Sequence, residues 1–436
     1  MTRRKSVVVL MLLMLAVLLT SPWASAPKPD RMPDATSEGQ EDVAAAPVMA
    51  EQPVELVVKI VQDEEAFRLL QRQSEAFERT HTDVRVRLER IDPSGAAGLL
   101  EDWRQAAGDA DAALVPSLWV KRIAVSGGLL PADSAFEGDA LSEQFEAVIA
   151  PLKWNGYMWG VPHHMDPYVV VWNRARLSAG ARPDGSELTL PLGADDWAPL
   201  GTELAGEGSR PWLAIDESDP AALVTWTGAA TGLRPDLLLG EATGEWGTGP
   251  GAALLDTLRG FAGALRAPDR SPAFWQAMAA GQYAAAVMRL SVAETGIAGL
   301  DKVQAAGLAI DRSGWDKAYA FDGGASFVIG AGTESESAAR TWIAAMTGER
   351  LQLDNYEEEG YLPVYRSAYL GYPGLPNLTG RGRQQFPNRE PAAGPEWPLL
   401  MQKFGLYWAD WRQGRLAIAE WPARWRGLLA ELQLHD

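Results

Sequence analysis

Short apolar strands alternate with amphipathic helices in the first ordered part of the chain. An apolar run at residues 54–60 is followed by Asp63, a residue type that caps helix N-termini, and by apolar residues at helical spacing up to Phe77. Further strand patterns follow at residues 84–91 and 111–115. Strands that alternate with helices predict βαβ units on a parallel sheet, so we expect an α/β fold.

Ligands of such sheets bind beyond the carboxyl ends of the strands. Gln62 directly follows the first predicted strand, and residues 116–119 follow the third, which is flanked by helical patterns at 99–107 and 120–125. These two turns are therefore candidate binding loops.

The N-terminus has the pattern of a secretory signal peptide over residues 1–26. A basic start is followed by thirteen apolar residues, Val7 to Leu19, and by the small-residue triplet Ala24-Ser25-Ala26. Thirteen apolar residues are fewer than the roughly 18 to 20 of a membrane-spanning helix. We expect an extracytoplasmic protein, either released or held by an uncleaved anchor that extends to Trp23.

Composition excludes several classes of protein. Residues 27–53 contain five prolines among small and polar residues and are predicted to be a disordered spacer. Removal of residues 1–26 changes the formal net charge from −18 to −21, so a basic nucleic-acid footprint is absent. The chain has no cysteine, which excludes disulfides, thiolate metal sites, a cysteine nucleophile and a lipoprotein anchor.

Later segments show both helical and irregular patterns. Thr333 and Glu336 have the spacing of a capping box for a helix over 337–346. Residues 369–398 are rich in Pro and Gly and are expected to form a long surface excursion, and residues 399–434 are predicted to be helical.

Four motifs follow one another along the chain. They are Gly127-Gly128-Leu129-Leu130-Pro131, then Trp154 to Pro162 with Asp166, Tyr168 and Trp172-Asn173, then Gly281 to Met288, and last Gly323-Gly324 followed by Gly360-Tyr361-Leu362-Pro363. In this order they resemble the extracellular solute-binding proteins of ABC importers, in particular the family that includes the maltose-binding proteins. The resemblance runs from about residue 54 to about residue 436.

This resemblance implies a two-lobed, periplasmic-binding-protein-like fold with hinge strands between the lobes. Lobe 1 is expected to contain residues 54–164 plus about 305–358, and lobe 2 residues 165–304 plus about 359–436. It further implies a non-catalytic monomer that closes over a small solute and delivers it to ABC permease subunits in the membrane. No cofactor is implied.

Some candidate ligand-binding residues follow the carboxyl ends of predicted strands, and others lie at matching positions of the family pattern. Asp166 matches a position that often accepts hydrogen bonds from sugar hydroxyls, and its alternative role is a hinge carboxylate that pairs with an arginine. If Arg289 faces the ligand, the ligand is acidic, for example a uronic acid; if Arg289 pairs with Asp166, the ligand is neutral. The full candidate set is Gln62, Ser117, Trp119, Asp166, Tyr168, Trp226, Arg289, Phe321, Gly324 and Tyr361.

A carbohydrate fits the composition, because the chain has 18 tryptophans and aromatic faces stack on sugar rings. His163, His164 and Asp166 also suggest a metal site. Adjacent residues on an extended strand point to opposite faces, so we expect that the two histidines do not converge and that no metal binds.

Two other classes share these features. A secreted glycosidase also places carboxylates among aromatic residues, although no nucleophile-elbow, zinc or P-loop motif is present. A secreted sensor that presents its ligand to a membrane receptor kinase would use the same binding residues.

Overall fold

The computed structural model describes residues 53–93, 96–107, 109–136, 141–179, 188, 190, 192, 194–206, 212–231, 259, 265–311, 323–376 and 394–433. The predicted signal peptide, the spacer up to residue 52, Phe321 and residues 377–393 of the predicted excursion lie outside this set. None of the described helices combines the length and the apolar character needed to cross a bilayer.

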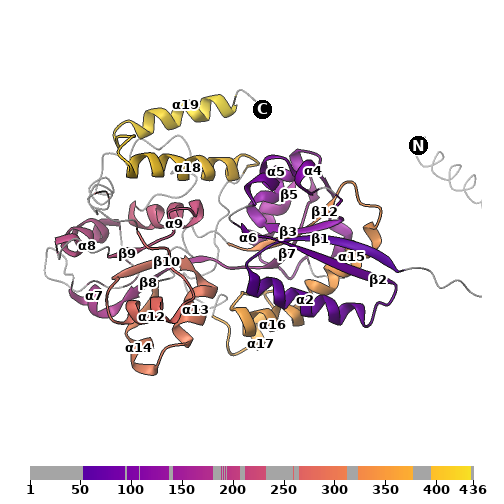
Figure 1. Cartoon of the computed structure of the whole chain (residues 1–436), viewed down its shortest axis with the longest axis horizontal. Helices are drawn as coiled ribbons and strands as arrows, with labels where there is room; N and C mark the ends of the chain where they lie inside the picture. Colours follow the sequence, from indigo (N-terminus) through magenta and orange to yellow (C-terminus); the bar gives the residue numbers. More distant parts are fainter. Residues whose placement is uncertain are drawn as a thin grey trace, which may run out of the picture. The chain divides into compact units, whose positions relative to one another are not determined.

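The described strands form two main sheets, and the elements around the first constitute the first lobe (Figure 1). In this sheet, β2, β1 and β3 are parallel, which confirms the predicted βαβ pattern. Strand β12 comes from much later in the sequence and pairs antiparallel with β3, β4 and β7. The strands are β1 (Val54–Val61), β2 (Val84–Ile91), β3 (Ala112–Pro116), β4 (Leu129–Leu130), β7 (Val161–His164) and β12 (Ala325–Gly330).

Helices cover both faces of this sheet. Alternation along β3 directs Leu114 toward the cluster formed with α2 and α15, and Val115 toward the cluster formed with α4 and α5. The predicted cap of α2 is confirmed, because the Asp63 carboxylate accepts from the Ala66 N–H at 3.0 Å. The helices are α2 (Glu64–Glu78), α3 (Ala97–Glu101), α4 (Trp103–Ala107), η3 (Ser117–Trp119), α5 (Val120–Val125), η4 (Asp133–Ala135), α6 (Glu146–Ile149), η5 (Ala150–Leu152), α15 (Glu336–Met346) and α16 (Glu349–Glu359).

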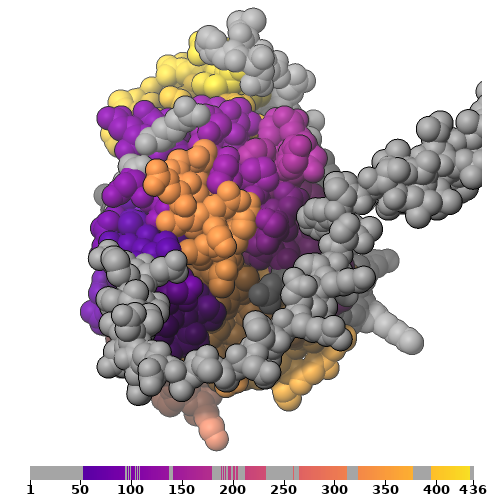
Figure 2. Space-filling view, turned by 90° about the vertical axis from the view of Figure 1, so that its right-hand side faces the viewer, coloured from indigo at the N-terminus to yellow at the C-terminus, as the bar shows by residue number. Residues whose placement is uncertain are grey.

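A hairpin and the returning segment, residues 325–359, complete the first lobe. Strands β5 (Lys153–Trp154) and β6 (Tyr157–Met158) are joined by Asn155 and Gly156, both with positive φ. In the space-filling view of Figure 2, orange residues of the returning segment lie among indigo and purple residues from the start of the chain. This face is therefore built from segments that are far apart in the sequence.

The predicted capping box at Thr333 is wrong in detail. Helix α15 begins at Glu336 with Ser335 as its N-cap, and no side chain caps it. The Thr333 hydroxyl instead donates to the Asp111 carboxylate at 2.5 Å and accepts from the Ser335 N–H. The Asp111 carboxylate also accepts from the Val57 N–H, so it connects Thr333 to strand β1 of the sheet.

The second lobe is built on a four-stranded sheet in the order β11-β8-β10-β9 among the described residues. Alternation along β8 directs Tyr168, Val170 and Trp172 into the core cluster formed with α9 and α18, and Val169 and Val171 into the cluster formed with α12 and α13. The strands are β8 (Tyr168–Asn173), β9 (Leu213–Ala214), β10 (Ala285–Arg289) and β11 (Leu308–Asp311). The helices are α7 (Arg174–Ala179), α8 (Ala194–Gly206), α9 (Pro220–Thr231), α12 (Pro272–Ala279), α13 (Leu290–Ala298), α14 (Lys302–Ala306), α18 (Trp397–Arg412) and α19 (Trp421–Gln433). Helix α17 (Ala368–Gly371) lies beside α16 (Figure 1).

The expected boundary near residue 305 differs from the strand pairing. Strand β11 lies after that boundary, yet it pairs antiparallel with β8 in the second sheet. The next described strand, β12, belongs to the first sheet. The predicted helices at the C-terminus are confirmed: α18 packs over α9 in the second lobe, and α19 packs on α18 through Trp421 and Trp425 (Figure 1).

Tryptophan dominates the larger core of the second lobe, where the described residues include nine buried indole rings. Trp226 lies in the middle of a row of rings and has no exposed surface. Its ring centroid is 6.2 Å from that of Trp197 and 6.0 Å from that of Trp408. Edge-to-face packing of this kind adds to the free energy gained by burying the rings.

We therefore expect Trp226→Ala to lower the free energy of unfolding by about 3 to 5 kcal/mol, the usual cost of removing a buried aromatic ring. Urea unfolding followed by circular dichroism measures this cost. The exposed ring of Tyr157, 54% accessible, provides the control, and Tyr157→Ala should change stability by about 0.5 kcal/mol or less. Equal stability of the two variants would contradict the core position of Trp226.

Candidate functional site

The two sheets are joined at a junction, which is formed by residues 165–167, Gly323-Gly324 and residues 360–362 lying against one another. The chain leaves β7 and enters β8 through residues 165–167, and it returns through Gly323-Gly324 and through residues 360–362. Met165 and Leu362 exchange two backbone hydrogen bonds of 2.9 Å. A methyl group at Gly323 would lie 1.9 Å from the Asp166 carbonyl oxygen, so only glycine allows this approach.

Asp166 lies at this junction and is only 2% exposed. Its carboxylate accepts from the Ser291 N–H at 2.9 Å and from the Ser291 hydroxyl at 2.7 Å. Ser291 belongs to the first turn of α13, so Asp166 satisfies a helix N–H group that would otherwise have no partner. Burial raises the pKa of Asp166, while Arg289 and the two hydrogen bonds act in the opposite direction.

Arg289 stands at the end of β10, opposite Tyr168 of β8. Its guanidinium carbon lies 5.1 Å from the centre of the Tyr168 ring, and its Nη1 donates to the Gly323 carbonyl. Burial alone would lower the pKa of Arg289, but Tyr168, Asp166 and Asp219 raise it, so the group stays charged. The positive charge is therefore balanced within the protein.

Asp219 is a second carboxylate at a helix start. Its Oδ1 accepts from the Ala221 N–H at 3.0 Å and caps α9, and its Oδ2 accepts from the Tyr168 hydroxyl. With Asp63 at α2 and Asp166 at α13, three aspartates satisfy three helix N-termini around the junction.

Arg270 links the two lobes. It precedes α12 in the second lobe, and its Nη1 donates to Glu65 of α2 at 3.3 Å and to Glu359 of α16 at 3.1 Å. Its Nη2 lies 3.9 Å from the Asp63 carboxylate.

Two histidines and a tyrosine complete the junction. His163 and His164 are buried, and their Nδ1 atoms are 2.8 Å apart. The prediction that they do not converge is wrong, because β7 has a register shift against β12 between Ala325 and Ser326. The Tyr361 ring stacks on His164 with centroids 4.0 Å apart.

Gln62 and Tyr361 carry polar groups without protein partners. Each is 7% exposed, and neither the Gln62 amide nor the Tyr361 hydroxyl has a hydrogen-bond partner among the described residues. Asp166, Asp63, Arg270 and Arg289 act electrostatically on the Tyr361 hydroxyl, which places it within the charged groups of the junction.

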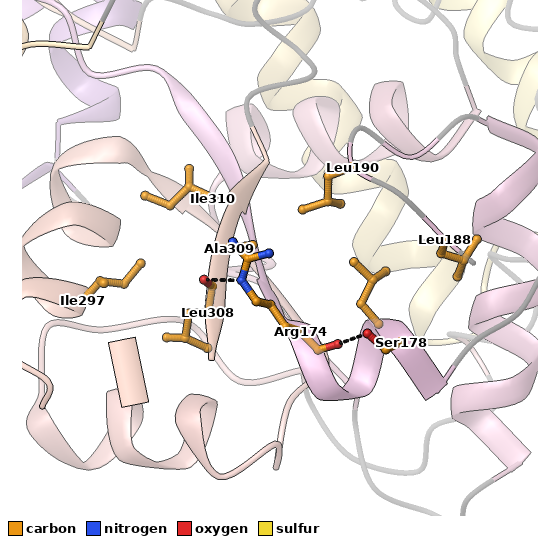
Figure 3. A pocket seen from close by; sticks show the side chains of 9 residues that line it. Arg174, Ser178, Leu188, Leu190, Ile297, Leu308, Ala309 and Ile310 are labelled. Carbon is orange, nitrogen blue, oxygen red and sulfur yellow. Dashed lines mark hydrogen bonds between the residues drawn. The ribbon is translucent and has the colours of Figure 1, made fainter. Parts of the chain in front are cut away.

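A separate cavity of about 680 Å³ lies in the second lobe beside α7 and β11 (Figure 3). Its walls are mostly aliphatic, and Arg174 donates from Nε to the Leu308 carbonyl at 3.1 Å. It contains none of the predicted site residues. No group of three or more His, Asp or Glu side chains in the described part of the chain is placed to hold a metal ion.

A family model described as "bacterial extracellular solute-binding protein" matches residues 73–375, more than two thirds of the chain. The chain belongs to this family. No curated protein matches it.

Solved structures share the fold of this solute-binding protein at low sequence identity. The GacH receptor of Streptomyces glaucescens, solved unliganded and with acarbose, has a TM-score of 0.64 and 18% identity, covering 88% of this chain and 99% of that one. A solute-binding protein of Agrobacterium vitis with bound D-mannitol has a TM-score of 0.62 and 13% identity over 87% and 98%. The sugar-binding protein MalE of Xanthomonas citri has a TM-score of 0.61 and 16% identity over 87% and 98%. The two-lobed fold of periplasmic binding proteins is thus established.

The structure brings five of the ten predicted residues together. Asp166, Tyr168, Arg289, Gly324 and Tyr361 meet at the junction, where a methyl group at Gly324 would lie 2.1 Å from the His164 carbonyl oxygen.

The other predicted residues differ in what they offer a ligand. Ser117 is 1% exposed, and its hydroxyl forms a hydrogen bond of 2.8 Å with the Ser326 hydroxyl. Trp119 is half-buried against the first-lobe core. Trp226 is enclosed in the core of the second lobe and has no face for a ligand in this conformation.

Sequence reasoning missed Asp219, Ser291 and Arg270 at the junction. Asp219 precedes Pro220, and an acidic residue followed by proline is a recognisable helix start, so this signal was available. Ser291 and Arg270 have no local pattern, because their partners Asp166 and Glu65 are far away in the sequence.

The Arg270 contacts predict that Arg270→Gln shifts the ligand-free protein toward separated lobes. Partly exposed ion pairs contribute up to about 1 kcal/mol, which changes the ratio of closed to open molecules severalfold. Small-angle X-ray scattering should show a larger radius of gyration. Arg68→Gln is the control, since Arg68 pairs with Glu64 on the same helix; an equal increase in both variants would refute the link.

The histidine pair predicts a loss of stability in mild acid. Burial lowers the pKa of His163 to about 4, from 6.5 in the unfolded chain. The unfolded state then binds more protons, so stability falls as the pH decreases from 6.5 toward 4, by about 3 kcal/mol for His163 alone. Urea unfolding at a series of pH values measures this. His163→Asn, which keeps a donor but does not titrate, should flatten the curve; an unchanged curve would contradict the assignment.

Proposed function

We propose that this solute-binding protein captures a neutral carbohydrate between its two lobes and delivers it to the permease subunits of an ABC importer. The observation that carries the proposal is a pair of free, neutral polar groups: the Tyr361 hydroxyl at the junction, and the amide of Gln62, the residue before Asp63, whose carboxylate lies 3.9 Å from Arg270. Each can both donate and accept a hydrogen bond, as a sugar hydroxyl does.

Electrostatics support a ligand without negative charge. Helix N-termini attract anions, but Asp63, Asp166 and Asp219 already satisfy the three helix starts at this place. Arg289 is balanced by Asp166 and Asp219, and Arg270 by Asp63, Glu65 and Glu359. Among the described residues of the junction, a uronic acid would therefore meet carboxylates and no free cation.

The solved relatives support the same ligand class. GacH is described with acarbose, the Agrobacterium vitis protein with D-mannitol, and the Xanthomonas citri protein as sugar-binding. Closure over a sugar requires that the closed state binds it better than the open state. The expected signal peptide would place this capture outside the cytoplasm, with the protein either released or anchored.

A thermal-shift panel tests the ligand class with maltose, acarbose and D-mannitol against glucuronic and galacturonic acids. We expect a neutral compound at 100 times its dissociation constant to stabilise the fold by about 2.7 kcal/mol, and the uronic acids to have the smaller effect. Gln62→Ala and Tyr361→Phe should each weaken binding about tenfold, the cost of one or two lost hydrogen bonds.

Gln105→Ala is the matched control, because Gln105 lies exposed on α4, away from the junction, and should bind like the wild type. A larger shift with the uronic acids would overturn the neutral ligand. Hydrolysis of the oligosaccharides by the purified protein would overturn the binding function in favour of a glycosidase.

A further inference from the structure

A buried chain of hydrogen bonds runs from α2 to the junction. The Gln73 Nε2 donates to the Asn355 Oδ1 at 2.7 Å, and the Asn355 Nδ2 lies 3.3 Å from the His163 Nε2. The His163 Nδ1 then faces the His164 Nδ1 at 2.8 Å. All four side chains are less than 10% exposed.

This order of donors fixes the tautomer of each imidazole ring. Because Asn355 presents its N–H₂ group, the His163 Nε2 must accept and carry no proton. A neutral His163 then has its proton on Nδ1 and donates it to the His164 Nδ1. His164 consequently carries its own proton on Nε2.

Both rings are held in the neutral state. Burial lowers the pKa of His164 well below its usual value, and His163 and Arg289 lower it further. A second proton on His163 would sit on Nε2 and face the Asn355 N–H₂ group, and a second proton on His164 would sit on Nδ1 and face the His163 Nδ1 proton. The Nε2 of His164 is therefore an uncharged donor at neutral pH.

That donor has no partner in the described part of the protein. The His164 Nε2 makes no hydrogen bond there, and it is not among the buried polar atoms that are sealed from solvent. The ring stacks on Tyr361, whose free hydroxyl lies among Asp166, Asp63, Arg270 and Arg289. His164 and Tyr361 thus present two adjacent unpaired polar groups at the junction.

We propose that His164 is a specificity-determining residue that donates its Nε2 proton to a hydroxyl oxygen of the bound sugar, and that Gln73, Asn355 and His163 act as positioning residues that fix this tautomer. The role rests on the proposed carbohydrate function. The fixed tautomer does not, because it follows from the protein's own contacts.

Nitrogen-15 NMR of histidine-labelled, ligand-free protein at pH 7 tests the tautomer. The chain has only four histidines, so single variants assign each signal. We expect a protonated Nε2 and an unprotonated Nδ1 in His164, with the opposite arrangement in His163. A charged ring, or the reverse pair of tautomers, would overturn the inference.

Asn355→Asp tests the buried chain of hydrogen bonds directly, since a carboxylate can only accept a proton from the His163 Nε2. We expect the protons of both rings to exchange positions, so that the His164 Nε2 loses its proton although His164 itself is unchanged. An unchanged His164 signal in a folded variant would refute the positioning role.

Binding of maltose, acarbose and D-mannitol tests the donor role in wild type and two variants. His164→Phe keeps a ring against Tyr361 but removes the donor, and should weaken the binding compound about tenfold. His164→Gln places an amide N–H₂ near the former Nε2 and should recover most of that loss. His81→Gln, at a histidine that stacks on Phe77 in the first lobe, should bind like the wild type.

The outcomes separate the two proposals. Equal affinity of His164→Phe and the wild type would overturn the donor role and leave the carbohydrate function intact. Failure of every sugar to bind the wild type would overturn the carbohydrate function and the donor role together, while the NMR result would still decide the tautomer.

Discussion

The close approach of Gly323-Gly324 to residues 164–166 is the contact on which the rest of the junction depends. Neither glycine could carry a side chain, because a methyl group would lie about 2 Å from a carbonyl oxygen. The approach brings the Gly323 carbonyl to the Arg289 guanidinium and holds Asp166 beside Ser291. Backbone packing therefore sets the positions of the charged groups at the junction.

The junction combines strong internal charge balance with a few unsatisfied neutral groups. Among the described residues, three aspartates occupy three helix starts at the junction, and Arg270 and Arg289 already have carboxylates nearby. The groups that we propose for solute binding, among the described residues, are an amide, a phenol and an imidazole N–H. Such a surface can recognise hydroxyl groups by direction and number without attracting ions, because directional hydrogen bonds provide the selectivity.

Local patterns predicted the parts of the fold that depend on local interactions. The parallel strands, the Asp63 cap and the C-terminal helices follow from periodicity and capping chemistry within about 15 residues. The convergence of the two histidines could not be predicted in this way, because the β-bulge arises from pairing with β12, about 160 residues later. Trp226 could have been recognised as a core residue, since α9 is apolar on all sides and such helices are buried.

Five of the predicted site residues meet at the junction. They could be predicted because the order of the family motifs identified the segments that cross from one lobe to the other. The partners of those residues were not visible in the sequence. Ser291, Asp219 and Asn355 are ordinary polar residues by type, and only the folded chain places them against Asp166, Tyr168 and His163.

The row of stacked indoles in the second lobe has a practical consequence for spectroscopy. Rings with centroids 5 to 6 Å apart, such as Trp172, Trp197, Trp226 and Trp408, exchange excitation energy and emit as a coupled group. These four rings are buried in the core of the second lobe, and none of them is one of the junction residues. A solute could bind at the junction and leave the emission of these tryptophans almost unchanged. A fluorescence titration without a signal change would therefore not show that the solute fails to bind.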